Sequence, residues 1–218
     1  MLGKNLLLDR RRKMKYALAT AAFIILFYML YRLNLEWLTR RYTERLILSY
    51  GDSETLPARL LFGAMCKRHV FTDLSLPIPS KDGEEINIGV VAVNRCGVFI
   101  ICRIQGEGVI ENPNEQRWKH VYNGSCSEFE NPFRTQEGAR NLIEYYAKNA
   151  GLSAVKAHSM LVYTNPSLRF THTLNRSIVS AENLSKKLSA MDKRGRLTHT
   201  EVRQTCRLLS DISSGAYI

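Results

Sequence analysis

An apolar segment near the N-terminus limits most strongly what this chain can fold into. Tyr16–Tyr31 is uncharged and strongly apolar, and at its centre stand Phe23, Ile24, Ile25, Leu26 and Phe27. A helix of this length rises about 24 Å, and Leu33 and Leu35 extend it toward the thickness of a bilayer core, about 30 Å. Tyr16 and Tyr31 suit the two lipid–water interfaces. The pattern predicts a membrane anchor over residues 16–35.

Basic residues flank this segment on both sides. On the N-terminal side, those that we expect to contact anionic lipid head groups are Arg10, Arg11, Arg12, Lys13 and Lys15. A cleaved signal peptide and a buried core helix are the alternatives. No small-residue cleavage site follows Tyr31, which disfavours the first alternative, and the charged flanks disfavour the second. The sequence therefore predicts a single membrane-spanning helix with membrane lipid as a partner.

The orientation of the anchor stays open. The larger basic cluster before the segment weakly favours a domain on the outer side of the membrane. The chain has an odd number of cysteines and no C-x-x-C pair: Cys66, Cys96, Cys102, Cys126 and Cys206. Such a set is typical of reduced core thiols in a cytoplasmic domain. The histidines are scattered singly, so no metal site and no cofactor is expected.

Charge is distributed unevenly along the chain. The net charge is +11, and residues 1–45 hold ten Lys or Arg against three Asp or Glu. The rest of the chain holds 21 against 17, so its excess is only four positive charges. A nucleic-acid-binding domain would need a basic stripe of its own, and none is obvious. Nucleic acid is therefore not the expected partner.

The strongest β signal follows further along the chain. Ile86–Val93 and Val98–Ile104 are almost continuously apolar, and residues 94–97 connect them tightly. Strands with this pattern lie at the centre of a sheet that is covered on both faces. We divide the chain into a basic flank (1–15), the anchor (16–35), a juxtamembrane helix and linker (36–54) and one α/β domain (55–218).

The other elements of the domain follow from turn and cap signals. The predicted helices are Leu56–Arg68, one from Asn131 and Pro132 to Gly151, one capped by Ser180, and one opened by a capping box at Thr198–Glu201. The predicted strands are Val70–Leu76, the hairpin, Val109–Ile110, Trp118–Tyr122, one within Val155–Thr164 and Ser177–Val179. Their order predicts one three-layer α/β domain with a mixed sheet.

Several side chains are expected on solvated loops. The acidic ones are Asp73, Glu84, Glu85, Glu128 and Glu130, and each should be solvated. Phe129 and Phe133 flank the Asn131–Pro132 cap, where they could form an exposed patch or a cap contact.

Residues 55–212 resemble a known family, the nuclease-related domain (NERD) of the PD-(D/E)xK nuclease fold. The features that carry the resemblance occur in one order along the chain: a helix before Val70–Leu76, the hairpin Val90–Ile101, Gly108 before Val109–Ile110, Trp118, Asn131–Pro132–Phe133, Leu197–Thr198 and Glu201–Val202. The resemblance implies the core architecture of that nuclease fold.

The same resemblance identifies positions at which the chemistry of the family is missing. Members that cut nucleic acid use an Asp and a Glu-x-Lys, because two carboxylates hold a divalent cation and the Lys orients water. Here Gly89, Cys102 and Ile104 occupy these positions in surroundings that we expect to be apolar, and the Gln of the family falls near Thr135 or Gln136. The resemblance implies a pseudo-nuclease, not an enzyme. A register error of two would bring in Asn87 or Glu107, although Glu107 is expected in a loop.

The layout of the whole chain is similar to that of the entry-exclusion proteins of I-complex conjugative plasmids. This similarity implies a single-pass protein of the bacterial inner membrane whose domain lies in the cytoplasm and binds a conjugation-system membrane protein. We therefore expect a non-catalytic interaction protein that blocks redundant conjugative DNA transfer. The alternative is a membrane-tethered nucleic-acid-binding protein or metal-dependent nuclease.

Overall fold

The computed structural model describes residues 20–34, 37–38, 41–42, 56–62, 69–79, 83–111, 116–171 and 177–214. The chain separates into two compact units, Met1–Arg45 and Leu46–Ile218. The expected head-group contacts Arg10–Lys15, Tyr16 at the start of the anchor, and Cys66 all lie outside the described residues.

The first unit contains a helix over residues 20–34. Each side chain of this helix is exposed, and the large apolar ones include Phe23, Ile24, Ile25, Leu26, Phe27 and Tyr31. Within the part of the chain that the structure describes, no helix is both long and apolar enough to cross a membrane.

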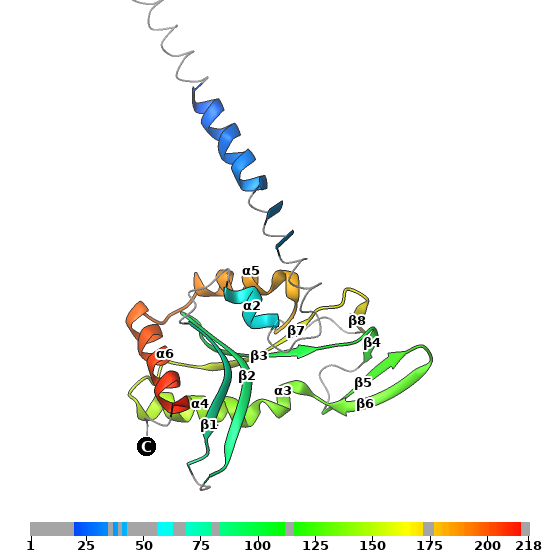
Figure 1. The fold of residues 1–218 in the computed structure, drawn as a ribbon, viewed down its shortest axis with the longest axis vertical. Coiled ribbons are helices and arrows are strands. Elements are labelled where there is room, and N and C mark those ends of the chain that lie inside the picture. The colour runs from blue at the N-terminus through cyan, green and yellow to red at the C-terminus, as the bar shows by residue number, and fades with distance from the viewer. Residues whose placement is uncertain are drawn as a thin grey trace, which may run out of the picture. The chain divides into compact units, whose positions relative to one another are not determined.

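The second unit is mixed α/β and contains two sheets (Figure 1). Its helices are α2 (Leu56–Phe62), α3 (Pro132–Thr135), α4 (Glu137–Asn149), α5 (Ala181–Asp192) and α6 (His199–Ser213). Its strands are β1 (Val70–Pro77), β2 (Glu85–Asn94), β3 (Gly97–Ile104), β4 (Gly108–Glu111), β5 (Arg117–Tyr122), β6 (Ser125–Glu130), β7 (Ala157–Tyr163), β8 (Leu168–Phe170) and β9 (Ile178–Ser180).

The larger sheet has the order β1-β2-β3-β7-β9. Strands β1, β2 and β3 are antiparallel, whereas β3, β7 and β9 are parallel. Helices α4 and α6 pack on one face and α2 and α5 on the other, as Figure 1 shows. The predicted three-layer arrangement is confirmed for this sheet, and so is the central hairpin, because β2 and β3 lie between β1 and β7.

The turn of the central hairpin depends on two residues. The Cys96 N–H donates to Asn94 Oδ1 at 2.7 Å, and Asn94 Nδ2 donates to the Leu188 carbonyl of α5 at 3.2 Å. Gly97 has a φ of +133°, and a Cβ there would collide with the Lys156 carbonyl oxygen. A residue without a side chain is therefore required where β3 begins beside the chain that leads into β7.

The β1–β2 hairpin twists over in its middle. Val90 packs in the cluster with α2 and α5, whereas Ile88, two residues earlier, packs with α4 and α6. Asp73 on the partner strand has a φ of +54°, and Gly89 stands opposite it between the pairs Thr72–Val90 and Leu74–Ile88. The twist turns the outer half of the hairpin, from the pair Leu74–Ile88 to the pair Pro77–Glu85, onto α4. Asp73 is thus part of a strand, and its predicted loop position is wrong.

The smaller sheet, with the order β6-β5-β4-β8, was not predicted as a separate sheet. Its strands β4 and β5 confirm the predicted strands at Val109–Ile110 and Trp118–Tyr122. Residues Asn123 and Gly124, with φ of +48° and +76°, form the predicted turn and lead into β6.

Three of the side chains expected in loops lie in β6, and one lies in β2. Glu128, Phe129 and Glu130 belong to β6, and Glu85 begins β2, so those loop predictions are wrong, while Glu84 lies in a loop as predicted. A strand was missed here because its side chains are polar and mostly exposed, which leaves no apolar alternation to detect. Phe129 and Phe133 are half-buried and do not form an exposed patch; both pack edge-on against Trp118, with ring centroids 5.9 Å apart in each pair.

Most predicted helix ends are confirmed. The Phe133 N–H donates to the Asn131 side chain at 3.0 Å, Gly151 with a φ of +78° follows α4, and the Thr198–Glu201 capping box opens α6. Ser180 precedes α5 but its side chain makes no capping hydrogen bond. The helix predicted from Asn131 to Gly151 is divided into α3 and α4 at Gln136.

Candidate functional site

The three sheet positions of the resemblance do not share one environment. The paired residues of β2 and β3 end at Val91–Ile100, where β2 turns away with the outer half of the hairpin. Ile104 is buried and Cys102 packs half-buried beside it, as expected for apolar surroundings. Gly89 is exposed, and a Cβ there would have no atom within 4 Å. The expectation of apolar surroundings is therefore wrong for Gly89, because the twist moves it out of the core.

The helix position of the resemblance is buried between α3 and α4. Gln136 is 5% exposed and precedes the buried Ala139 and Ile143 by three and seven residues, so it shares their sheet-facing side. Thr135 is exposed, and its hydroxyl donates to the Pro132 carbonyl at 2.9 Å. Of the two residues that the resemblance left open, Gln136 is the one that faces the sheet. Neither polar atom of its side-chain amide has a hydrogen-bond partner among the described residues.

Ser159 is a second buried polar residue on the same side of the sheet, and sequence reasoning did not single it out. It lies on β7 opposite Ile100, between Ala157 and Leu161, which pack toward the side of α3 and α4. Ser159 is 8% exposed, and its hydroxyl has no partner among the described residues. The sequence signal that could have identified Ser159 is a single hydroxyl side chain at a core-facing position of an otherwise apolar strand.

Glu107 lies in the loop between β3 and β4, as predicted, and gathers several polar side chains. Its carboxylate accepts hydrogen bonds from the Tyr122 hydroxyl at 2.9 Å and from Asn165 Nδ2 at 3.1 Å. The ring of His120 stacks on that of Tyr122, and its Nε2 lies 2.5 Å from the Glu107 carbonyl oxygen. The hydrogen bond to Glu107 raises the pKa of the Tyr122 phenol.

This cluster does not form a metal centre. Both carboxylate oxygens of Glu107 already accept hydrogen bonds from protein donors. Across the described residues, no group of three or more His, Cys, Asp or Glu side chains could hold a metal ion. The arrangement orders the loop after β3 and joins it to β5 and to the chain before β8.

Among the residues that the structure describes, no cysteine is part of a disulfide. Cys206 is buried as predicted, Cys96 and Cys102 are half-buried, and Cys126 is exposed. The Cys96 thiol donates to the Met191 carbonyl at 3.0 Å, and burial together with the nearby Asp192 carboxylate raises its pKa. A thiol with a raised pKa carries little thiolate at neutral pH, so Cys96 is a poor nucleophile.

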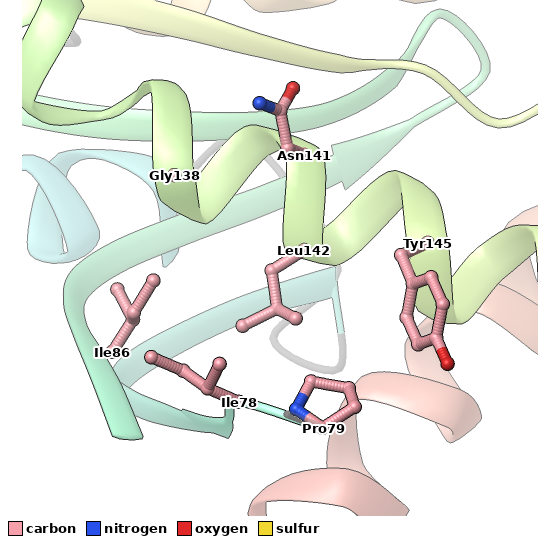
Figure 2. A pocket seen from close by; sticks show the side chains of 7 residues that line it. All are labelled: Ile78, Pro79, Ile86, Gly138, Asn141, Leu142 and Tyr145. Carbon is pink, nitrogen blue, oxygen red and sulfur yellow. The ribbon is translucent and has the colours of Figure 1, made fainter. Parts of the chain in front are cut away.

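An open apolar groove runs along α4 (Figure 2). It has a volume of about 720 Å³ and is lined by Ile78, Pro79, Ile86, Gly138, Asn141, Leu142 and Tyr145. In Figure 2, Leu142 points from α4 toward Ile78 and Pro79, Ile86 points toward the turn of the helix at Gly138, and Asn141 points away. The Tyr146 hydroxyl donates to the Pro77 carbonyl at 2.9 Å and holds this half of the hairpin against the helix. A concave apolar surface of this size can accept apolar side chains of a ligand or partner.

Comparisons with protein-family models, with curated proteins and with solved structures find no match to this chain. The resemblance to the nuclease-related domain and the similarity to entry-exclusion proteins therefore stay predictions.

Proposed function

We propose that this chain is a membrane-anchored, non-catalytic interaction protein that blocks redundant conjugative DNA transfer by binding a conjugation-system membrane protein. The observation that carries the proposal is the open groove on α4, because its walls are apolar and its rim residue Tyr145 is 47% exposed. Solvent-exposed apolar surface is a cost to an isolated domain and is typical of a contact surface for another molecule.

The sheet positions of the resemblance support a role without catalysis. Cys102 and Ile104 offer no hard oxygen ligand for a divalent cation, and Gly89 offers no side chain at all. The Glu107 carboxylate, which was the remaining candidate, accepts hydrogen bonds from Tyr122 and Asn165 instead. Cation-assisted hydrolysis therefore has no evident set of ligands among these residues.

The N-terminal unit supports the membrane anchor. All around the helix of residues 20–34, side chains are exposed, and Phe23–Phe27 are apolar without interruption. A helix that is apolar on all sides is stable when lipid or protein surrounds it, not water. The basic residues before it would stay at the head groups. We propose the bacterial inner membrane as its location, with the second unit in the cytoplasm.

Plasmid transfer into recipient cells tests the function. Recipients that express the full chain should receive a conjugative plasmid recognised by the protein at least tenfold less often than recipients with an empty vector. A plasmid with an unrelated transfer system is the control, and its transfer frequency should not change. Equal frequencies for every conjugative plasmid tested, with the chain present in the membrane fraction, would contradict the proposal.

A cleavage assay tests the alternative of a metal-dependent nuclease. The purified full chain should leave single- and double-stranded DNA intact with Mg²⁺ or Mn²⁺. Metal-dependent cleavage that disappears in Glu107→Gln or Glu85→Gln would replace the interaction protein with the tethered nuclease. Cleavage that survives both changes would point to a contaminating enzyme and is checked with a mock purification.

A further inference from the structure

Two polar side chains that have no hydrogen-bond partner among the described residues are buried on the side of the larger sheet that α3 and α4 cover. They are the Gln136 amide and the Ser159 hydroxyl, which are 5% and 8% exposed. A buried amide or hydroxyl that loses its hydrogen bonds to water without replacing them is destabilising. Such groups in folded proteins are normally satisfied by protein or by ordered water.

Two contacts fix the level of α4 over β7. Arg140 Nε donates to the Ala157 carbonyl at 3.2 Å, and the Ala157 N–H donates to Glu144 Oε1 at 3.0 Å. These two contacts and the short connection between α4 and β7 mean that the elements run antiparallel. Going back from Arg140 to Gln136 covers about 6 Å along the helix, and going on from Ala157 to Ser159 covers about 6.6 Å along the strand. Counted from the Arg140 contact, the two residues therefore lie at a similar level of the interface.

The surroundings of this level are apolar. Ser159 pairs with Ile100 and is followed by Leu161 on the same side of β7, and Gln136 is followed by Ala139 and Ile143 on the same side of α4. All four of these apolar residues are buried. A charged ligand would find no opposite charge on them, so a neutral molecule suits the site.

We propose that Gln136 and Ser159 together bind one buried water molecule, which bridges the amide and the hydroxyl. The amide offers donors and an acceptor, and the hydroxyl can act as either. A water molecule offers two donors and two acceptors and needs two to four polar partners to remain buried. The bridge ties the break between α3 and α4 to β7, and in this way it fixes the start of the helix that carries the groove.

A thermal unfolding cycle on the full chain in detergent micelles tests the bridge. The variants are Gln136→Met, Ser159→Ala and the double change, with the exposed Gln204→Met and Ser153→Ala as matched controls. Each single change should lower the unfolding midpoint by about 2–6 °C, because the water loses a partner. The double change should lower it clearly less than the two losses added together, and the controls should shift it by under about 1 °C. Losses that add, or a higher midpoint in either single variant, would overturn the proposal.

A second measurement separates a bridging water from a direct hydrogen bond between the two side chains. In the full chain labelled with ¹⁵N-glutamine, the Gln136 side-chain amide should show a cross-peak to a long-lived water. The peak should disappear in Ser159→Ala. A protected Gln136 amide without a water cross-peak in the unmodified chain would mean direct bonding and would overturn the proposal.

Discussion

The two sheets of this domain differ in how they are covered. The larger sheet has helices on both faces, and its central strand β3 is buried at most positions. The smaller sheet buries one side around Trp118, while β6 is exposed at five of its six residues. The larger sheet therefore supplies most of the core of the domain, whereas the smaller sheet is held through a single apolar cluster, in which Trp118 also contacts Phe133 of α3.

Truncating one buried aromatic residue in each sheet should give the largest loss of stability and should separate the roles of the two sheets. Phe99 on β3 and Trp118 on β5 are 1% and 0% exposed. Replacing either with Ala should cost about 3–5 kcal/mol of local packing. Phe99→Ala should lower the free energy of unfolding of the whole domain, whereas Trp118→Ala should chiefly release β4, β5 and β6. Hydrogen exchange checks this, and equal loss of amide protection in both sheets for Trp118→Ala would make them one cooperative unit.

Two glycines of the central hairpin give the next largest contrast. Gly97→Ala should destabilise the domain by more than about 2 kcal/mol, because its positive φ is strained for Ala and a Cβ meets the Lys156 carbonyl. Gly89→Ala, in open space without a positive φ, should change stability by under about 0.5 kcal/mol. Chemical denaturation measures both. Equal losses would mean that the twist at Gly89 is as constrained as the turn.

Loss of the capping box of α6, a helix that packs on the larger sheet, should lower the free energy of unfolding by less than the change at Gly97. The Glu201 side chain accepts from the Thr198 N–H at 2.7 Å, and the Thr198 hydroxyl accepts from the Glu201 N–H at 3.2 Å. Thr198→Ala should cost about 1 kcal/mol at neutral pH.

The same box should make stability depend on pH. The backbone hydrogen bond from Thr198, and then its hydroxyl, lower the pKa of Glu201 in the folded chain. Its stabilising contribution is thus complete above the ordinary pKa of a Glu and is lost as the pH falls through the lowered value. The stability difference between the unmodified chain and Glu201→Ala should accordingly shrink in acid. A difference that grows below pH 4.5, the ordinary value of the group, would contradict this sign.

The smallest effect should come from the outer face of the smaller sheet. Lys119 Nζ lies 3.9 Å from Glu128 Oε1, and the two side chains are 44% and 48% exposed. Ion pairs with this exposure contribute about 0–0.5 kcal/mol, so Lys119→Ala should leave the unfolding midpoint nearly unchanged. A loss above about 1 kcal/mol would show that this face is covered by another molecule in the sample.

The sequence predicted the larger sheet better than the smaller one for a physical reason. Continuous apolar runs such as Val98–Ile104 show that a strand is covered on both faces, and caps such as Asn131 and Thr198 depend on neighbouring residues only. Strand β6 lacks such a run, and the twist at Asp73 and Gly89 depends on pairing between strands.

The sites were harder to predict than the fold. The buried position of Gln136 could be placed to within one residue, but the inference that Ser159 lies at a similar level required the packing of α4 on β7. The groove likewise requires the outer half of the hairpin to curl onto α4, which no local pattern indicates.

Two tyrosines, one near each sheet, provide the most direct test of the proposed binding surface. Tyr145 at the groove and Tyr122 on β5 are 47% and 42% exposed. In the recipient assay, a binding surface on α4 predicts that Tyr145→Ala restores plasmid transfer by at least tenfold while Tyr122→Ala keeps the block, at equal amounts of membrane-bound protein. A block that Tyr122→Ala removes and Tyr145→Ala leaves intact would contradict the groove and place the contact on the smaller sheet.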